Sequence, residues 1–172
     1  MADNAPADLR SARGGMVLRV IESWWAPRRV VRSLSGMPDR VMLVVLMVAM
    51  LISLIAQAPG HARAAALDPL IPLEARIGGA VMGTIFMMPL LAYGMAALTS
   101  VLSRLTPWRL DPQDARLALF WALLAVSPAM LLAGMVAGLI GPGPALMLTQ
   151  TIAGLAFLFI WGAGIAALVR RL

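Results

Sequence analysis

The sequence contains no cysteine and no lysine, and it has one histidine and one tyrosine among its 172 residues. Without cysteine, disulfides, thiolate metal sites and cysteine nucleophiles are all excluded. Charged residues make up 13% of the chain, whereas ordinary soluble domains contain about 25%. The net charge of +6 comes from arginines that flank apolar segments. This placement favours the lipid bilayer and its anionic headgroups as the partner, with no nucleic acid.

Long apolar runs are what the chain has in abundance. Residues 117–140 and 145–169 contain no ionisable side chain, and each run exceeds the roughly 20 residues that a helix needs to cross a bilayer. The Gly-Pro-Gly-Pro sequence at 141–144 can form only a tight turn between them. The two runs therefore predict a transmembrane helical hairpin.

Two further apolar runs complete the predicted architecture. We expect an all-α polytopic membrane bundle with four transmembrane helices at about 41–57, 77–102, 117–140 and 145–169. These spans form a transmembrane domain over residues 37–172. Residues 1–15 are polar, lack hydrophobic periodicity and are predicted to be disordered.

Residues 16–36 predict an amphipathic helical segment that precedes the spans. Apolar residues recur at three- and four-residue spacing, and Pro27 is expected to break or bend the helix. The predicted membrane-surface residues are Trp24, Trp25, Arg28, Arg29 and Arg32. An alternative is that this segment packs on the protein's own bundle and touches lipid only incidentally.

The distribution of arginine predicts the orientation. With four spans, twelve arginines lie on one side of the membrane, in the first forty residues, the second loop and the C-terminus. The other side has only Arg63 and Arg76, in a long loop that we expect at 58–76. Positive charge concentrates on the cytoplasmic side, so both termini are predicted to be cytoplasmic, in the inner membrane of a bacterium.

Small residues and prolines mark the predicted contact and bend positions within the spans. Gly79 and Gly83 are four residues apart, as are Gly134 and Gly138, and this spacing allows helices to approach closely. Pro89 and Pro128 lie in mid-span and predict helix kinks.

The sequence shows no pattern of residues that is typical of a catalytic site within the spans. None of the spans contains Asp, Glu, Lys, Arg or His, although proton relays and ion pathways usually need such a residue. We expect no enzyme activity, no cofactor and no metal. An enzyme acting at the interface would require His61, Asp68 and Glu74 to converge in the first loop.

Five short motifs together resemble the bacterial branch of the Yip domain family, which is named for its Ypt/Rab-GTPase-interacting members. They are residues 21–29 (IESWWAPRR), 77–80 (IGGA), 89–93 (PLLAY), 115–122 (ARLALFWA) and 141–144 (GPGP). The resemblance implies a compact helical membrane domain with a cytoplasmic N-terminus. The chain has four predicted spans where that family usually has five, and it lacks the Asp-Leu-Tyr-Gly-Pro motif of eukaryotic members. GTPase binding is therefore not implied.

The sequence thus predicts a non-catalytic scaffold or accessory subunit that packs its helices against other integral membrane proteins or against itself. The alternative is a transporter or channel component for an uncharged or lipidic substrate. That alternative predicts a polar cavity near Pro89, Tyr93, Pro128 and Gln150.

Overall fold

The computed structural model describes residues 15–171, so nearly all of the segment predicted to be disordered, 1–15, lies outside the described residues. Its regular elements are helices, apart from two strands of two residues each. Its elements are, in order, α2 (Met16–Glu22), α3 (Pro27–Ser33), α4 (Asp39–Leu67), α5 (Leu73–Val81), the π-helix η1 (Met82–Met87), α6 (Met88–Ser103), β1 (Trp108–Arg109), α7 (Pro112–Ala125), α8 (Ser127–Leu139), α9 (Pro144–Leu168) and β2 (Arg170–Arg171).

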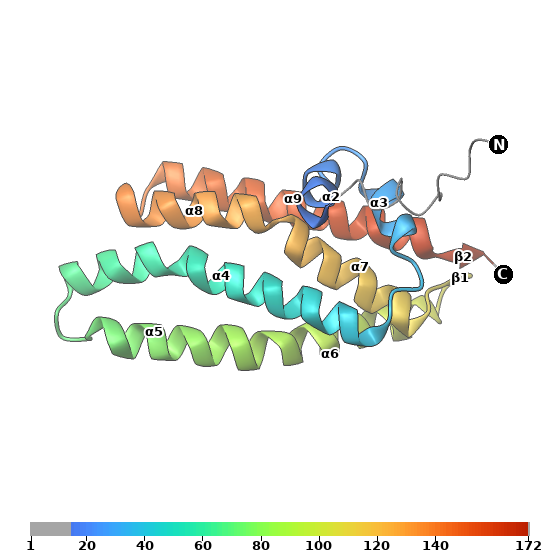
Figure 1. Ribbon diagram of the computed structural model, residues 1–172, viewed down its shortest axis with the longest axis horizontal. Helices are drawn as coiled ribbons and strands as arrows, with labels where there is room; N and C mark the ends of the chain where they lie inside the picture. The colour runs from blue at the N-terminus through green and yellow to red at the C-terminus, as the bar shows by residue number, and fades with distance from the viewer. Residues whose placement is uncertain (1–14, 172) are drawn as a thin grey trace, which may run out of the picture.

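The long helices run side by side along the long axis of the molecule (Figure 1). In this view α4 lies between α8 on one side and the α5–η1–α6 helix on the other. Helix α7 packs against α4, α6 and α9, and it carries much of the core, including Phe120 and Trp121. The core therefore sits around α7, at one end of the bundle.

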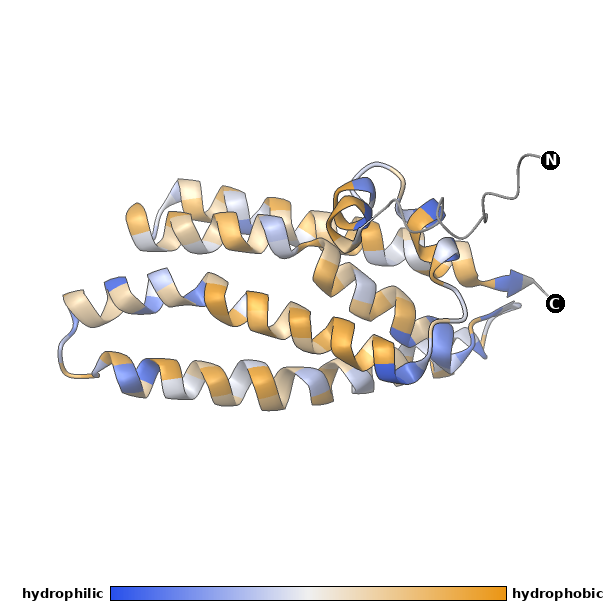
Figure 2. Ribbon diagram, viewed as in Figure 1, coloured by the Kyte–Doolittle hydropathy of each residue, from blue (hydrophilic) through white to orange (hydrophobic). Residues whose placement is uncertain are grey.

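Three helices are long and apolar enough to cross a membrane: Asp39–Leu67, Leu73–Ser103 and Pro144–Leu168. The pair α7 and α8 passes the same test together, with a bend of 42° between the two helices. Hydrophobic residues cover the middle of the long helices, whereas hydrophilic residues gather toward the two ends of the bundle (Figure 2). This pattern is typical of a membrane protein.

The apolar run 117–140 does not form one straight helix. Helix α7 ends at Ala125, and α8 begins at Ser127 with Pro128 in its first turn. Proline has no N–H to donate and its ring crowds the preceding turn, so an uninterrupted helix is unfavourable there. Hydrophobicity alone did not reveal that the two halves point in different directions.

The predicted loop at 58–76 is wrong for most of its length. Helix α4 continues to Leu67 with Pro59 inside it, and α5 begins at Leu73. The connection between these helices is therefore only 68–72. Alanines at 62 and 64–66 favour helix, and α8 packs along this part of α4, so packing overrides the turn signal from Pro59 and Gly60.

The segment 16–36 forms two short helices joined by a turn. Helix α2 ends at Glu22, and Pro27 begins α3, so the predicted break falls at Pro27. Helix α3 packs against α9 and α7, burying Val30 and Val31. Helix α2 has no buried residue, and in Figure 1 it is seen nearly end-on, across the bundle axis.

The elements that carry most of the arginines lie at one end of the bundle. Strand β1, in the loop after α6, pairs antiparallel with β2 near the C-terminus, with Trp108 opposite Arg171 and Arg109 opposite Arg170. Helix α3 lies at the same end, whereas the turns 68–72 and 140–143 lie at the opposite end (Figure 1). Arg76 and Arg63 bond to residues at or next to these two turns.

Candidate functional site

The two tryptophans of the turn after α2 have different surroundings. Trp24 is half-buried, and its indole Nε1 donates a hydrogen bond of 3.1 Å to the carbonyl of Ala125, at the break between α7 and α8. Trp25 leaves 76% of its surface exposed. Only Trp25 is therefore free to contact a membrane surface with its whole ring.

The three predicted surface arginines are all exposed, yet they have different contacts. Arg29 lies 3.7 Å from the carboxylate of Glu22. Arg32 donates a 3.2 Å hydrogen bond to the carbonyl of Ala167, in the last turn of α9, where a cation is favourable. The Arg28 side chain makes no hydrogen bond or ion pair with the described residues.

A buried polar contact that sequence analysis missed holds the turn between α2 and α3, residues 23–26, in place. The Trp121 indole Nε1 donates a 2.9 Å hydrogen bond to the hydroxyl of Ser23, and that hydroxyl donates to the Arg19 carbonyl at 2.7 Å. Both Ser23 and Trp121 are fully buried. The two residues are 98 positions apart, so no local pattern could have linked them.

The two glycine pairs occupy opposite environments. A Cβ added to Gly134 would overlap the carbonyl oxygen of Ala56, and one added to Gly138 would overlap Pro59, so α8 lies directly on α4. A Cβ added to Gly79 or Gly83 would meet nothing within 4 Å among the described residues beyond its own helix. The structure thus uses one pair inside the chain and leaves the other pair facing outward.

Each of the two mid-span prolines follows a helix irregularity. Pro89 lies in the first turn of α6, directly after the π-helix η1, and Pro128 lies in the first turn of α8, after the 42° bend. Within η1, Thr84 is buried and accepts a 3.0 Å hydrogen bond from Gln57 of α4. π-Helical turns are frequent at functional sites, so this polar contact is the most distinctive one inside the spans.

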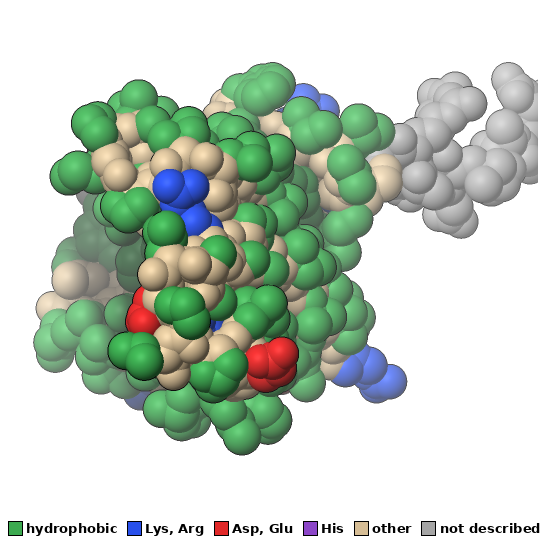
Figure 3. Space-filling view, turned by 90° about the vertical axis from the view of Figure 1, so that its left-hand side faces the viewer, with side chains coloured by type: hydrophobic (Ala, Val, Ile, Leu, Met, Phe, Trp, Pro, Cys, Tyr) green, Lys and Arg blue, Asp and Glu red, His purple; other side chains and the backbone are tan. Residues whose placement is uncertain are grey.

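The end of the molecule opposite the arginine-rich end is mainly hydrophobic, with small charged patches (Figure 3). Arg63 lies on α4 and donates two 3.3 Å hydrogen bonds, to the carbonyls of Gly138 and Leu139. It thereby caps the C-terminus of α8. Its guanidinium lies against Gly141, whose φ of +93° suits glycine in the predicted tight turn.

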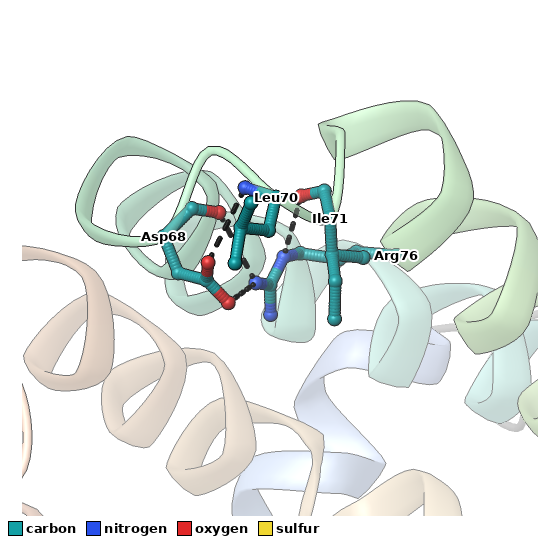
Figure 4. Close-up of polar contacts among 4 residues, drawn as sticks. All are labelled: Asp68, Leu70, Ile71 and Arg76. Carbon is teal, nitrogen blue, oxygen red and sulfur yellow. Dashed lines mark hydrogen bonds and ion pairs between the residues drawn. The ribbon is translucent and has the colours of Figure 1, made fainter.

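An ion pair closes the short connection between α4 and α5 (Figure 4). Arg76 Nη2 lies 3.0 Å from a carboxylate oxygen of Asp68, and Arg76 Nε donates a 3.1 Å hydrogen bond to the carbonyl of Ile71. The Asp68 carboxylate also accepts a hydrogen bond from the backbone N–H of Leu70. These contacts give both side chains a structural role at this turn.

The three groups that an interfacial enzyme would have needed do not form a joint site. His61 lies within α4, Asp68 is paired with Arg76, and Glu74 is exposed in the first turn of α5. Among residues 15–171, no three histidine or carboxylate side chains are grouped so that they could hold a metal ion. The predictions of no enzyme activity and no cofactor stay predictions.

Helix α7 begins with Asp111 at its N-cap and Pro112 in its first turn, although the Asp111 side chain makes no capping hydrogen bond. It borders an open, mixed-charge cleft of about 810 Å³ at the arginine-rich end. The charged residues that line this cleft are Arg32, Asp111, Asp114, Arg116 and Arg170.

The four residues named for a transport cavity have different surroundings. The Tyr93 ring packs edge-on against Phe120, with 5.0 Å between ring centroids. Pro128 and Gln150 are exposed, and Pro89 is half-buried. None of the four lines the mixed-charge cleft at the arginine-rich end.

Comparison with known proteins adds no relative to these observations. No protein-family model matches the chain, and no match was found among curated proteins or solved structures. The resemblance to the Yip domain family therefore stays a prediction from the five motifs.

Proposed function

We propose that this protein is a non-catalytic membrane scaffold or accessory subunit that packs a helix of another membrane protein against its α5–η1–α6 span. The observation that carries the proposal is the outward-facing pair Gly79 and Gly83. A Cβ added to either glycine would meet open space. At the same spacing, Gly134 and Gly138 hold a neighbouring helix in close contact within the chain.

The burial of the spans supports this assignment. Only 17% of the most apolar window of Leu73–Ser103 is buried inside the chain, against 33% for α4 and 22% for α9. Helix α5 itself has no buried residue. Exposed Met82 and Phe86 lie near the glycines in the chain. A partner helix would therefore contact two glycines with large apolar side chains beside them. Close packing of this kind drives helix association in lipid.

The membrane placement is part of the same proposal. We place four spans in a bacterial inner membrane, counting α7 and α8 as one bent span, with the arginine-rich end in the cytoplasm. The pairing of β1 with β2 supports this arrangement, because it brings the second loop and the C-terminal end to the same side. Membership of the Yip domain family belongs to the proposal too and rests on the sequence motifs alone.

A pull-down from native membranes tests the proposal. The tagged protein, extracted in a mild detergent, is expected to retain a stoichiometric membrane protein identified by quantitative mass spectrometry. The double variant Gly79→Leu/Gly83→Leu should lose that partner, because the added side chains prevent close approach. Gly154→Leu, on the open surface of α9, is the matched control and should keep it. Recovery of the chain alone, or equal recovery from all three proteins, would refute the scaffold role.

A transport role for an uncharged or lipidic substrate is our second candidate, favoured by the π-helix and its partly buried Gln57–Thr84 contact. Discontinuous helices with polar contacts at membrane depth are where transporters bind substrate. Thr84→Val should then abolish uptake into proteoliposomes, whereas Thr99→Val, which changes a hydroxyl bonded only to its own helix, should not. Unchanged uptake in Thr84→Val would remove this candidate.

A further inference from the structure

A groove of about 530 Å³ lies between the turn after α2 and the C-terminal half of α9. We call it the elbow groove; it is lined by Trp25, Ala26, Pro27, Arg28, Leu158, Phe159, Gly162 and Ala163. Arg28 is the one charged residue among them. Gly162 leaves the floor open, since a Cβ there would meet nothing within 4 Å among the described residues.

The elbow groove marks the point at which α9 stops exposing large apolar side chains. The exposed ones on this helix are Met147, Leu148, Ile152, Leu155, Leu158 and Phe159. Beyond Phe159, Ile160 and Leu168 are buried within the protein, and Trp161 and Ile165 are half-buried. A hydrocarbon-facing surface that ends at an exposed tryptophan is typical of the boundary between acyl chains and headgroups.

The turn after α2 supplies what a headgroup boundary needs. The exposed apolar side chains of α2, Val17, Leu18 and Ile21, lie just before Trp25 in the chain, and the helix crosses the bundle axis in Figure 1. Arg28 is exposed and has no counter-ion among the described residues, whereas its neighbour Arg29 lies close to Glu22. An uncompensated cation at the edge of an apolar surface attracts an anion.

We propose that the elbow groove binds one phospholipid with an anionic headgroup. Its phosphate contacts Arg28, and the upper part of one acyl chain lies over Phe159 and Gly162 beside the Trp25 ring. Residues 158–163 of α9 span roughly 7.5 Å along the helix axis. That length is too short to seat a membrane-crossing helix of about 30 Å, so a single lipid fits the groove better than a partner span. This site is independent of the scaffold role.

Native mass spectrometry of the detergent-purified protein, titrated with short-chain phosphatidylglycerol, tests the proposal. The wild type should bind one molecule before any others, and more tightly than it binds phosphatidylcholine. Arg28→Gln should raise the Kd about tenfold, the size expected for one charge-assisted hydrogen bond. Gly162→Leu, which fills the floor, should abolish the first binding event.

Matched controls separate a discrete site from general attraction to a basic surface. Arg29→Gln removes the same charge one residue away but outside the groove lining, and Gly154→Leu adds the same bulk elsewhere on α9. Both should leave the Kd within about twofold of wild type, well under the tenfold step of a lost charge-assisted contact. Equal weakening by Arg28→Gln and Arg29→Gln would overturn the proposal, as would equal affinity for the two lipids. Should Gly162→Leu fail to fold, the comparison of the two arginine variants decides.

Discussion

Helices α8 and α5 both pack on α4, and both belong to segments with two glycines four residues apart. The glycines of α8 face α4, whereas those of the α5–η1 segment face away from the rest of the described chain. Those of α8, Gly134 and Gly138, meet the α4 backbone around Ala56 and Pro59. Gly79 of α5 and Gly83 of the following η1 face open space beyond their own helix. The same spacing therefore closes an internal contact in one case and leaves a surface unfilled in the other.

The difference teaches how to interpret small-residue spacing in a membrane chain. In lipid, apolar side chains gain little by leaving one hydrocarbon environment for another, so close backbone approach drives association. In the contact between α4 and α8, the two backbones already lie close together. The α5–η1 face has the same glycine spacing but no neighbouring helix against it in the described chain. We therefore assign this face to a partner helix.

The largest effect should come from filling the closed contact. Gly134→Leu or Gly138→Leu would force α8 away from the α4 backbone, and we expect a loss of stability of about 3 kcal/mol, the upper range for overpacking. Thermal unfolding in detergent, followed by circular dichroism, measures it. Gly154→Leu is the control, and a wild-type melting temperature in Gly138→Leu would contradict the packing.

The hydrogen bond between Ser23, in the turn between α2 and α3, and Trp121 of α7 is buried. Breaking this bond should lower the stability by less than filling the contact between α4 and α8. Ser23→Ala leaves the buried Trp121 N–H without its acceptor, which should destabilise the protein by about 2 kcal/mol. Ser33→Ala is the control, since that exposed hydroxyl bonds only to the carbonyl of Val30, three residues before it in the chain. Equal melting temperatures for the two variants would mean that the Ser23–Trp121 bond contributes nothing.

The span Leu73–Ser103, of which α5 and η1 are the first part, should respond more weakly to loss of its polar contact with α4. Thr84→Val removes the acceptor of the 3.0 Å bond from Gln57 while keeping the volume, and we expect a loss of about 1 kcal/mol, typical of hydrogen bonds between membrane helices. Thr99→Val serves as the control, because its hydroxyl bonds to Met95 within α6. An effect as large as that of Gly138→Leu would show that η1 is held on α4 as tightly as α8 is.

The smallest effect on stability should come from filling the open face. Gly79→Leu/Gly83→Leu meets no neighbour, and leucine favours helix over glycine by up to about 1 kcal/mol per residue. The melting temperature of the purified protein should stay the same or rise slightly. A fall of several degrees would mean that the face is closed by this chain itself.

Three of the four predicted apolar runs lie in helices long enough to cross a membrane, because membrane-length runs have few alternative structures. The tight turn at Gly141 was confirmed. These features depend on residues next to one another in the chain. Local composition is sufficient for them.

The features that sequence analysis missed depend on contacts between distant residues. Continuation of α4 past Gln57 depends on α8 packing beside Pro59, and the Ser23–Trp121 bond joins positions far apart. Helix α7 is apolar nearly all round, so its pattern showed no buried face to distinguish it from a lipid-facing span. Which glycine pair meets a neighbour is likewise a property of the assembled bundle, not of the spacing.

The most direct test of the central claim is photocrosslinking in native membranes with p-benzoylphenylalanine in place of Met82, which lies beside Gly83 and is 63% exposed. Leu155, on α9 and 62% exposed, is the matched control position. The account predicts one discrete adduct with another integral membrane protein from position 82 and none from position 155. Adducts of equal yield from both positions, or none from position 82, would contradict a partner helix on the open face.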